Sequence, residues 1–176
     1  VGPYFKGGFK STPFMLSRKY DRAAPLGTGN IKVGGNYAAS MTATVESHDM
    51  GYSNVFYLDP KEKRYIDECG AANFFAIKGN AYLTPRSRSI LPSITNRSLI
   101  TLAEDMGMRI ERRPISVDEL GHFDECGACG TAAVISPVSK IVDIENDITY
   151  VFGDGNPGPK STELYNRLRA IQLGEA

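Results

Sequence analysis

Residues 27–40 read GTGNIKVGGNYAAS, and they are the strongest indication of the fold. It places Lys32 between two glycine-containing segments, just before a helix that the pattern of small apolar residues predicts from Tyr37 to about Gly51. The glycines allow something bulky to approach the backbone closely, and a phenol at the helix start can point back towards the same cavity. A lysine in this position is either a solvated surface charge or an amine that serves chemistry, and Lys32 taken alone does not decide between them.

Outward from this stretch, the chain alternates predicted strands and helices. The predicted strands are residues 54–58, 65–69, 74–78 and 131–138, with Gly79-Asn80 as a hairpin turn. The predicted helices are residues 96–106 with Thr95 as N-cap, a short helix opened by a capping box from Ser116 to Glu119, and residues 162–173. This order indicates one mixed α/β (α+β) domain and neither a sandwich nor a helix bundle.

Composition narrows the class of protein. Lys plus Arg and Asp plus Glu number 20 each among 176 residues, so the formal net charge is zero and the global field that attracts nucleic acid or an anionic membrane is absent. No apolar run is long enough to cross a bilayer, and three cysteines favour a reducing compartment, the cytoplasm. The chain opens with Val1 rather than Met and reads like the middle of a domain, so we expect a fragment of a longer protein.

Three other positions offer groups that would complement an amine at Lys32. Glu68 ends a predicted strand. Its carboxylate can pair with the protonated ring nitrogen of a pyridine cofactor that reacts with the amine. Free amides at Ile94-Thr95, where a helix begins, and in the small-residue stretch Gly130-Thr131-Ala132 can bind an anion. Each signal has a plain structural alternative, namely an exposed acid, an ordinary N-cap and a tight turn.

Together these stretches resemble a known family. Residues 27–40 resemble the cofactor-lysine motif of branched-chain aminotransferases, which are fold-type IV enzymes that use pyridoxal 5'-phosphate (PLP). Three more stretches follow in the family's order: residues 65–75 are similar to its ring-nitrogen carboxylate segment, residues 89–97 to its phosphate loop, and residues 125–133 to its loop for phosphate and substrate carboxylate. Four ordered motifs are far more specific than one glycine pattern.

The resemblance implies a role for each candidate. Lys32 forms the Schiff base and moves the proton between the substrate α-carbon and the C4′ atom of the cofactor. Tyr37 hydrogen-bonds the phenolic oxygen of PLP, and Glu68 pairs with its pyridinium nitrogen. The reaction implied is transfer of the amino group of leucine, isoleucine or valine to 2-oxoglutarate.

The same resemblance assigns the anion-binding groups and the architecture. The Ile94 and Thr95 amides, with Thr131, hold the phosphate, and the Thr131 and Ala132 amides bind the substrate carboxylate. The expected fold is the large domain of the D-amino acid aminotransferase-like type, a barrel-like mixed sheet with flanking helices. Residues 1–176 then form the C-terminal PLP-binding domain, the smaller N-terminal domain lies outside the chain, and the full-length protein is a homodimer.

This sequence departs from the family pattern at Ser93, at Asn96 and at Ala71-Ala72, which we expect to change the pocket shape. Other fold-type IV enzymes, such as a D-amino acid aminotransferase or an aminodeoxychorismate lyase, remain alternatives, as does a non-catalytic domain that keeps the fold. The Cys126 and Cys129 pair has the C-x-x-C spacing of metal and redox sites, but we predict small buried thiols and no metal.

Overall fold

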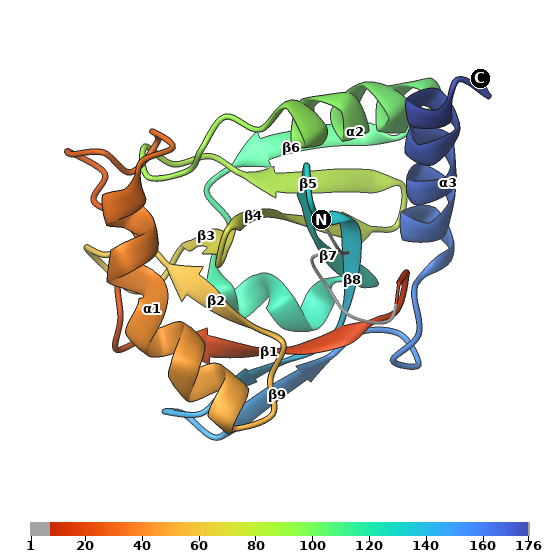
Figure 1. The fold of residues 1–176 in the computed structure, drawn as a ribbon. Coiled ribbons are helices and arrows are strands. Elements are labelled where there is room, and N and C mark those ends of the chain that lie inside the picture. Colours follow the sequence, from red (N-terminus) through yellow and green to blue (C-terminus); the bar gives the residue numbers. More distant parts are fainter. Residues whose placement is uncertain (1–7, 176) are drawn as a thin grey trace.

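The computed structural model describes residues 8–175, which form a nine-stranded sheet with three α-helices on its outside (Figure 1). The elements in chain order are β1 (Thr12–Ser17), α1 (Gly34–Asp49), β2 (Asn54–Leu58), β3 (Ile66–Cys69), β4 (Ala72–Lys78), β5 (Ala81–Pro85), α2 (Ile94–Asp105), β6 (Arg109–Arg113), the 3-10 helix η1 (Val117–His122), β7 (Glu125–Gly130), β8 (Val134–Asp143), β9 (Ile148–Val151) and α3 (Pro159–Leu173). Within the described residues, no helix is both long and apolar enough to cross a membrane.

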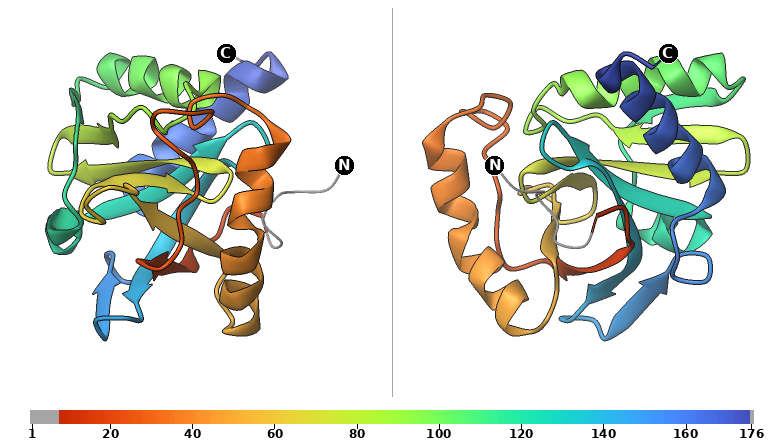
Figure 2. Two further views of the ribbon diagram at one scale, coloured as in Figure 1. Left: turned by 90° about the vertical axis from the view of Figure 1, so that its left-hand side faces the viewer. Right: turned by 45° about the vertical axis from the view of Figure 1, so that its right-hand side comes forward.

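The sheet closes on itself. Its strands follow the order β3-β2-β1-β8-β7-β4, and an additional pairing between β3 and β4 joins the two ends into a six-stranded barrel. β5 and β6 continue the sheet from β4, and β9 pairs with β8. The barrel is mixed, because β1 lies parallel to both of its neighbours while β7 is antiparallel to β4 and β8. The barrel-like mixed sheet with flanking helices is thus confirmed (Figure 2).

Alternating side chains along the strands separate the interior of the barrel from its covered outer faces. Phe14 on β1 and Phe74 on β4 point into one interior cluster, whereas their neighbours Met15 and Phe75 belong to two other clusters. The Met15 cluster packs under α1, and the Phe75 cluster packs under α2 and α3. Each helix therefore covers an outer face of the barrel, and α1 lies on the opposite side from α3 (Figure 1).

The predicted strand at residues 131–138 is wrong in its boundaries. Residues 131–133 form a turn between β7 and β8, and the ladder resumes where Gly130 pairs with Val134. The sequence favoured a strand because Thr131 and the residues after it are small or β-branched. However, the antiparallel strands β7 and β8 need a tight turn between them, and residues 131–133 form it. Val134, the first residue after this turn, adopts a φ of 54°. The strands predicted at residues 54–58, 65–69 and 74–78 are β2, β3 and β4.

The helix starts also differ from the sequence prediction. Ser93, not Thr95, caps α2, since its Oγ accepts a hydrogen bond from the Asn96 amide at 3.1 Å. α3 begins at Pro159 rather than at residue 162, because proline fits the first turn of a helix. The capping box that opens η1 at Ser116 is present as predicted.

Candidate active site

Lys32, Tyr37 and Glu68 line one cleft between the start of α1 and the β3–β4 hairpin. The residues that line this central cleft are Arg22, Ile31, Lys32, Asn36, Tyr37, Ser40, Glu68, Gly70, Ala71, Asn73 and Leu91. The cleft is narrow, about 30 Å³, but it adjoins two wider hollows. One, of about 100 Å³, reaches the start of α2 and shares Asn73 and Leu91 with the cleft, and the other, of about 410 Å³, runs along α1.

The loop that presents Lys32 is held by polar contacts at the start of α1. The buried Asn36 donates through Nδ2 to the carbonyl oxygens of Thr28 at 2.7 Å and Ile31 at 2.8 Å. At Gly29 a Cβ would lie 2.5 Å from the Ala24 carbonyl oxygen, so only glycine lets the loop pack this closely. Lys32 itself is exposed, so its side chain is free to reach the cleft from a fixed loop.

Glu68 is the buried acid of the cleft. It lies near the end of β3 and is 3% exposed. Its Oε1 accepts hydrogen bonds from Asn73 Nδ2 at 2.8 Å and from the Leu91 amide at 3.1 Å, and its Oε2 forms an ion pair with Arg22 at 2.7 Å. Burial raises the pKa of Glu68 to about 7, against the opposing effects of the Arg22 guanidinium and the Leu91 amide. A carboxyl with this pKa exchanges a proton near neutral pH.

The start of α2 offers two backbone donors. Of the first four amides of the helix, those of Asn96 and Arg97 donate to the Oγ and carbonyl oxygens of Ser93. The amides of Ile94 and Thr95 therefore keep no partner within residues 8–175 and can bind an anion. Ile94 is exposed and Thr95 is buried, so this donor pair lies at the surface of the fold.

Ser93 and Asn96, two of the departures from the family pattern, have structural partners in this chain. Ser93 is the N-cap of α2. Asn96 accepts a hydrogen bond from the Tyr82 hydroxyl at 2.7 Å and donates to Thr84 Oγ1 at 2.9 Å. Ser93 therefore caps the helix, and Asn96 fixes its start against β5.

The turn between β7 and β8 carries the last predicted site residues. Thr131 and Ala132 are exposed in this turn and do not line the central cleft. The turn nevertheless lies near it, since a Cβ on Gly130 would contact Ala72 and since Cys129 pairs with Asn73 across the β4–β7 ladder. The structure thus brings together Lys32, Tyr37 and Glu68 in one cleft and places the two segments that the sequence predicts to bind anions nearby.

Among the cleft residues that the sequence did not predict, Arg22, Asn36 and Asn73 make the polar contacts described here. Arg22 lies outside the recognised motifs, and its partner Glu68 is 46 positions away, so only closure of the barrel reveals the pair. Asn36 and Asn73 lie within the stretches that resemble the family, but the resemblance implies no role for either. A buried amide side chain must satisfy its own hydrogen bonds, and that need was the one available signal.

The C-x-x-C pair does not form a site. Cys126 and Cys129 are three positions apart on β7, so their side chains point to opposite faces, one into the barrel and one under the helices. Both thiols are free and fully buried, and burial raises the pKa of each well above its ordinary value. Among the described residues, no group of three or more side chains could hold a metal ion.

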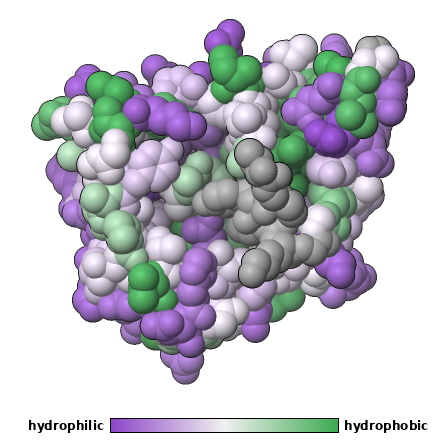
Figure 3. Space-filling model, in the orientation of Figure 1, coloured by the Kyte–Doolittle hydropathy of each residue, from purple (hydrophilic) through white to green (hydrophobic). Residues whose placement is uncertain are grey.

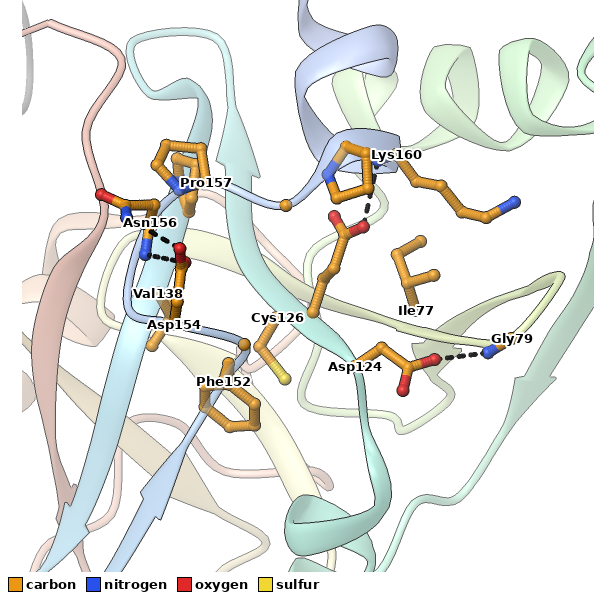
Figure 4. Close-up of a pocket in the computed structure, with 15 residues that line it drawn as sticks. Ile77, Gly79, Asp124, Cys126, Val138, Phe152, Asp154, Asn156, Pro157 and Lys160 are labelled. Carbon is orange, nitrogen blue, oxygen red and sulfur yellow. Dashed lines mark hydrogen bonds between the residues drawn. The ribbon is translucent and has the colours of Figure 1, made fainter.

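A larger cavity, of about 490 Å³, lies at the start of α3 (Figure 4), and Lys32 is not among the residues that line it. Its acids are used within the fold. Glu125 points to the first turn of α3 and accepts from the amides of Lys160 at 3.0 Å and Ser161 at 2.8 Å, and Asp124 accepts from the Gly79 amide. This cavity offers no lysine–tyrosine pair and no free helix amides, so the central cleft is the better candidate for the active site.

Comparison with known proteins agrees with this geometry. The family model for amino-transferase class IV matches residues 10–141. Branched-chain-amino-acid aminotransferases from Helicobacter pylori (strain J99) and Haemophilus influenzae are 49% and 46% identical to the chain, and each alignment covers 99% of it. These alignments cover 51% and 52% of the two relatives, so the chain spans about half the length of the curated relatives it matches.

Solved structures of branched-chain amino acid aminotransferases are also similar to this chain. The branched-chain amino acid aminotransferase of Escherichia coli superposes with a TM-score of 0.88 at 30% identity, over 100% of this chain and 56% of that one. The branched-chain amino acid aminotransferase of Thermobaculum terrenum, solved in its PLP form, superposes with a TM-score of 0.83 at 28% identity, over 94% and 52%. The match covers the barrel, the lysine loop and the start of α2, and the chain belongs to the class IV aminotransferase family.

Proposed function

We propose that this chain is the cofactor-carrying, C-terminal domain of a PLP-dependent branched-chain amino acid aminotransferase. The full-length enzyme transfers the amino group of leucine, isoleucine or valine to 2-oxoglutarate. The observation that carries the proposal is the shared cleft of an amine, a phenol and a buried carboxylate, Lys32, Tyr37 and Glu68, beside two free helix amides. The names of the relatives support the choice of substrate.

The groups of the cleft fit PLP. The cofactor supplies an aldehyde that condenses with amines and a protonated ring that withdraws electrons from the bond that breaks. Lys32 Nζ would provide the amine and would carry the proton between the substrate α-carbon and the cofactor C4′ atom. Tyr37 Oη would hydrogen-bond the phenolic oxygen of the ring, and Glu68 would hold a proton on the ring nitrogen.

The segments around the cleft would bind the two anions of the reaction. The amides of Ile94 and Thr95, at the positive end of α2, hold the phosphate together with Thr131. The amides of Thr131 and Ala132 bind the substrate carboxylate from the exposed turn beside Asn73. The ring would then lie between these segments, beside Lys32, Tyr37 and Glu68.

We further propose that an N-terminal domain outside this chain, or the second subunit of a homodimer, covers the surface next to the cleft. Tyr37, Met41 and Val45 follow one another at four-residue spacing on α1 and are 43%, 64% and 56% exposed. Figure 3 shows hydrophobic side chains along the side of the molecule where α1 lies. An apolar stripe of this kind favours burial against another protein surface. The three free, buried cysteines suit our placement of the enzyme in the cytoplasm.

The test is glutamate formation by the full-length protein with 2-oxoglutarate as acceptor. We expect leucine to be a far better amino donor than D-alanine, and we expect K32A to abolish turnover while K61A, at an exposed lysine, leaves it unchanged. Preference for D-alanine would identify a D-amino acid aminotransferase instead. Wild-type turnover by K32A would reject a Schiff-base enzyme. The isolated chain should bind PLP weakly and turn over slowly, and full activity of residues 1–176 alone would refute the need for another domain.

A further inference from the structure

Arg22 lies at the floor of the central cleft, in the segment between β1 and α1. Its side chain is 10% exposed, and Nη2 lies 2.7 Å from Glu68 Oε2. The same nitrogen donates to the carbonyl oxygens of Gly29, at 3.2 Å, and of Ser89. A carboxylate and two backbone carbonyls from three different segments therefore hold the guanidinium in one place.

This arrangement leaves one acceptor position on Glu68. A carboxylate oxygen accepts about two hydrogen bonds. Oε1 already accepts two, from Asn73 and from the Leu91 amide, whereas Oε2 has Arg22 as its partner among the described residues. The oxygen with capacity to bind a ring N–H is thus the one that Arg22 holds.

Arg22 also affects where a shared proton would lie. A proton between a carboxylate and a pyridine nitrogen rests on the more basic of the two. Burial and the neighbouring acid Asp67 raise the pKa of Glu68, and the positive charge of Arg22 lowers it. Without that charge, a carboxyl in so dry a site would keep the proton and leave the ring neutral.

We propose that Arg22 is a positioning residue for Glu68, which turns Oε2 towards the ring nitrogen of bound PLP and biases their shared proton onto that nitrogen. The proposal rests on the proposed function. Arg22 touches neither the substrate nor the reacting carbon, and it acts through Glu68 alone.

The experiment measures the ring nitrogen directly. Full-length protein is loaded with PLP labelled with ¹⁵N in the ring, and the ¹⁵N chemical shift reports whether that nitrogen carries a proton. We expect a protonated ring in the wild type and in the control R167Q, which alters an exposed arginine on α3. In R22Q the ¹⁵N shift should move towards that of neutral pyridine. PLP affinity should fall roughly tenfold, because the hydrogen bond between the ring nitrogen and Glu68 would no longer be charge-assisted. A protonated ring and unchanged affinity in R22Q would overturn the proposal.

A double-mutant cycle separates this role from a merely structural one. R22Q should weaken PLP binding when Glu68 is present and should cause no further loss in an E68Q background. An equal loss in both backgrounds would overturn the proposal. Should R22Q fail to fold, R22K replaces it in the same cycle, because lysine keeps the positive charge but lacks the planar guanidinium. We then expect R22K to lower PLP affinity about threefold when Glu68 is present and not at all in the E68Q background. Unchanged affinity in R22K would then count against the proposal.

The outcome for Arg22 is distinguishable from the outcome for the enzyme. Wild-type protein that does not bind PLP at all would reject the proposed function itself. Wild-type protein that binds PLP, together with R22Q and R22K variants that bind it equally well, would reject only the role of Arg22.

Discussion

Thr28 and Asn36 exchange hydrogen bonds across the loop that carries Lys32. Thr28 Oγ1 donates to Asn36 Oδ1 at 3.0 Å, and Asn36 Nδ2 donates to the Thr28 carbonyl oxygen at 2.7 Å. Asn36 is 8% exposed and belongs to the first turn of α1, so the helix and the loop before it form one rigid unit. The amine of Lys32 is therefore exposed but anchored on a loop that these contacts hold in place.

Replacing Asn36 by alanine should loosen this unit. N36A removes three hydrogen bonds of a buried side chain and takes one of two donors from each of the Thr28 and Ile31 carbonyl oxygens, which should lower the free energy of unfolding by about 1–3 kcal/mol. N166A, at an exposed asparagine of α3, should change it by less than about 0.5 kcal/mol. Urea unfolding measures both, and equal stability of the two variants would show that the Asn36 contacts contribute nothing.

Two glycines of the same stretch should respond in opposite directions to a methyl group. At Gly29 the new Cβ would lie 2.5 Å from the Ala24 carbonyl oxygen and 2.8 Å from Ser89 Cα, both in the backbone, so G29A should cost about 1–3 kcal/mol. At Gly34 nothing lies within 4 Å, and G34A should be neutral or stabilise by up to about 1 kcal/mol. Thermal melting of both variants decides the matter, and a stable G29A would mean that the loop adapts without cost.

The pKa of Glu68 predicts how the stability of the PLP-free protein depends on pH. Since the folded-state pKa of about 7 lies above the ordinary value of 4.5, the folded protein binds more protons than the unfolded chain between these values. Stability should therefore fall as pH rises from 4.5 to 7, by roughly 3 kcal/mol at most. Acids whose pKa is lowered, such as Glu119, act in the opposite direction but are present in every variant.

The comparison of wild type with E68Q isolates this effect. The difference in unfolding free energy between the two proteins, measured from pH 4.5 to pH 7.5, should move against the wild type as pH increases. A constant difference would mean that Glu68 titrates normally and is not the buried acid described above.

Glu125 should stabilise the start of α3. Its two carboxylate oxygens accept from the amides of Lys160 and Ser161, and an amide in their place would turn a donor towards one of these N–H groups. E125Q should therefore lower the unfolding free energy by about 1–3 kcal/mol, whereas E163Q, which removes an exposed pair with Arg167, should cost no more than about 0.5 kcal/mol. Calorimetry distinguishes the two, and equal melting temperatures would contradict a capping role.

The sequence alone predicted what depends on neighbours along the chain. The glycine-flanked Lys32, the helix after it, the β3 segment with Glu68 and the capping box at Ser116 all rest on local spacing, and the fold class was confirmed. Long-range features escaped it. β7 was missed because small residues such as Gly127 and Ala128 show no alternation in a strand paired on both sides.

The same limit applies to the site. Arg22 and Glu68 meet only because β3 pairs with β2 and β4 in a closed barrel, and no local pattern encodes that contact. The cap of α2 was assigned to Thr95 rather than Ser93 because both residues are good caps. The hydrogen bond from the Asn96 amide distinguishes them, and it appears only in the structure.

The most direct measurement concerns Lys32 itself. Full-length protein is incubated with PLP, reduced with borohydride and digested with a protease. The masses of the resulting peptides are then measured by mass spectrometry. We expect the reduced pyridoxyl phosphate group on the peptide that contains Lys32, at close to one per chain. A label on other lysines such as Lys19 or Lys63, with residue 32 unmodified, would contradict it.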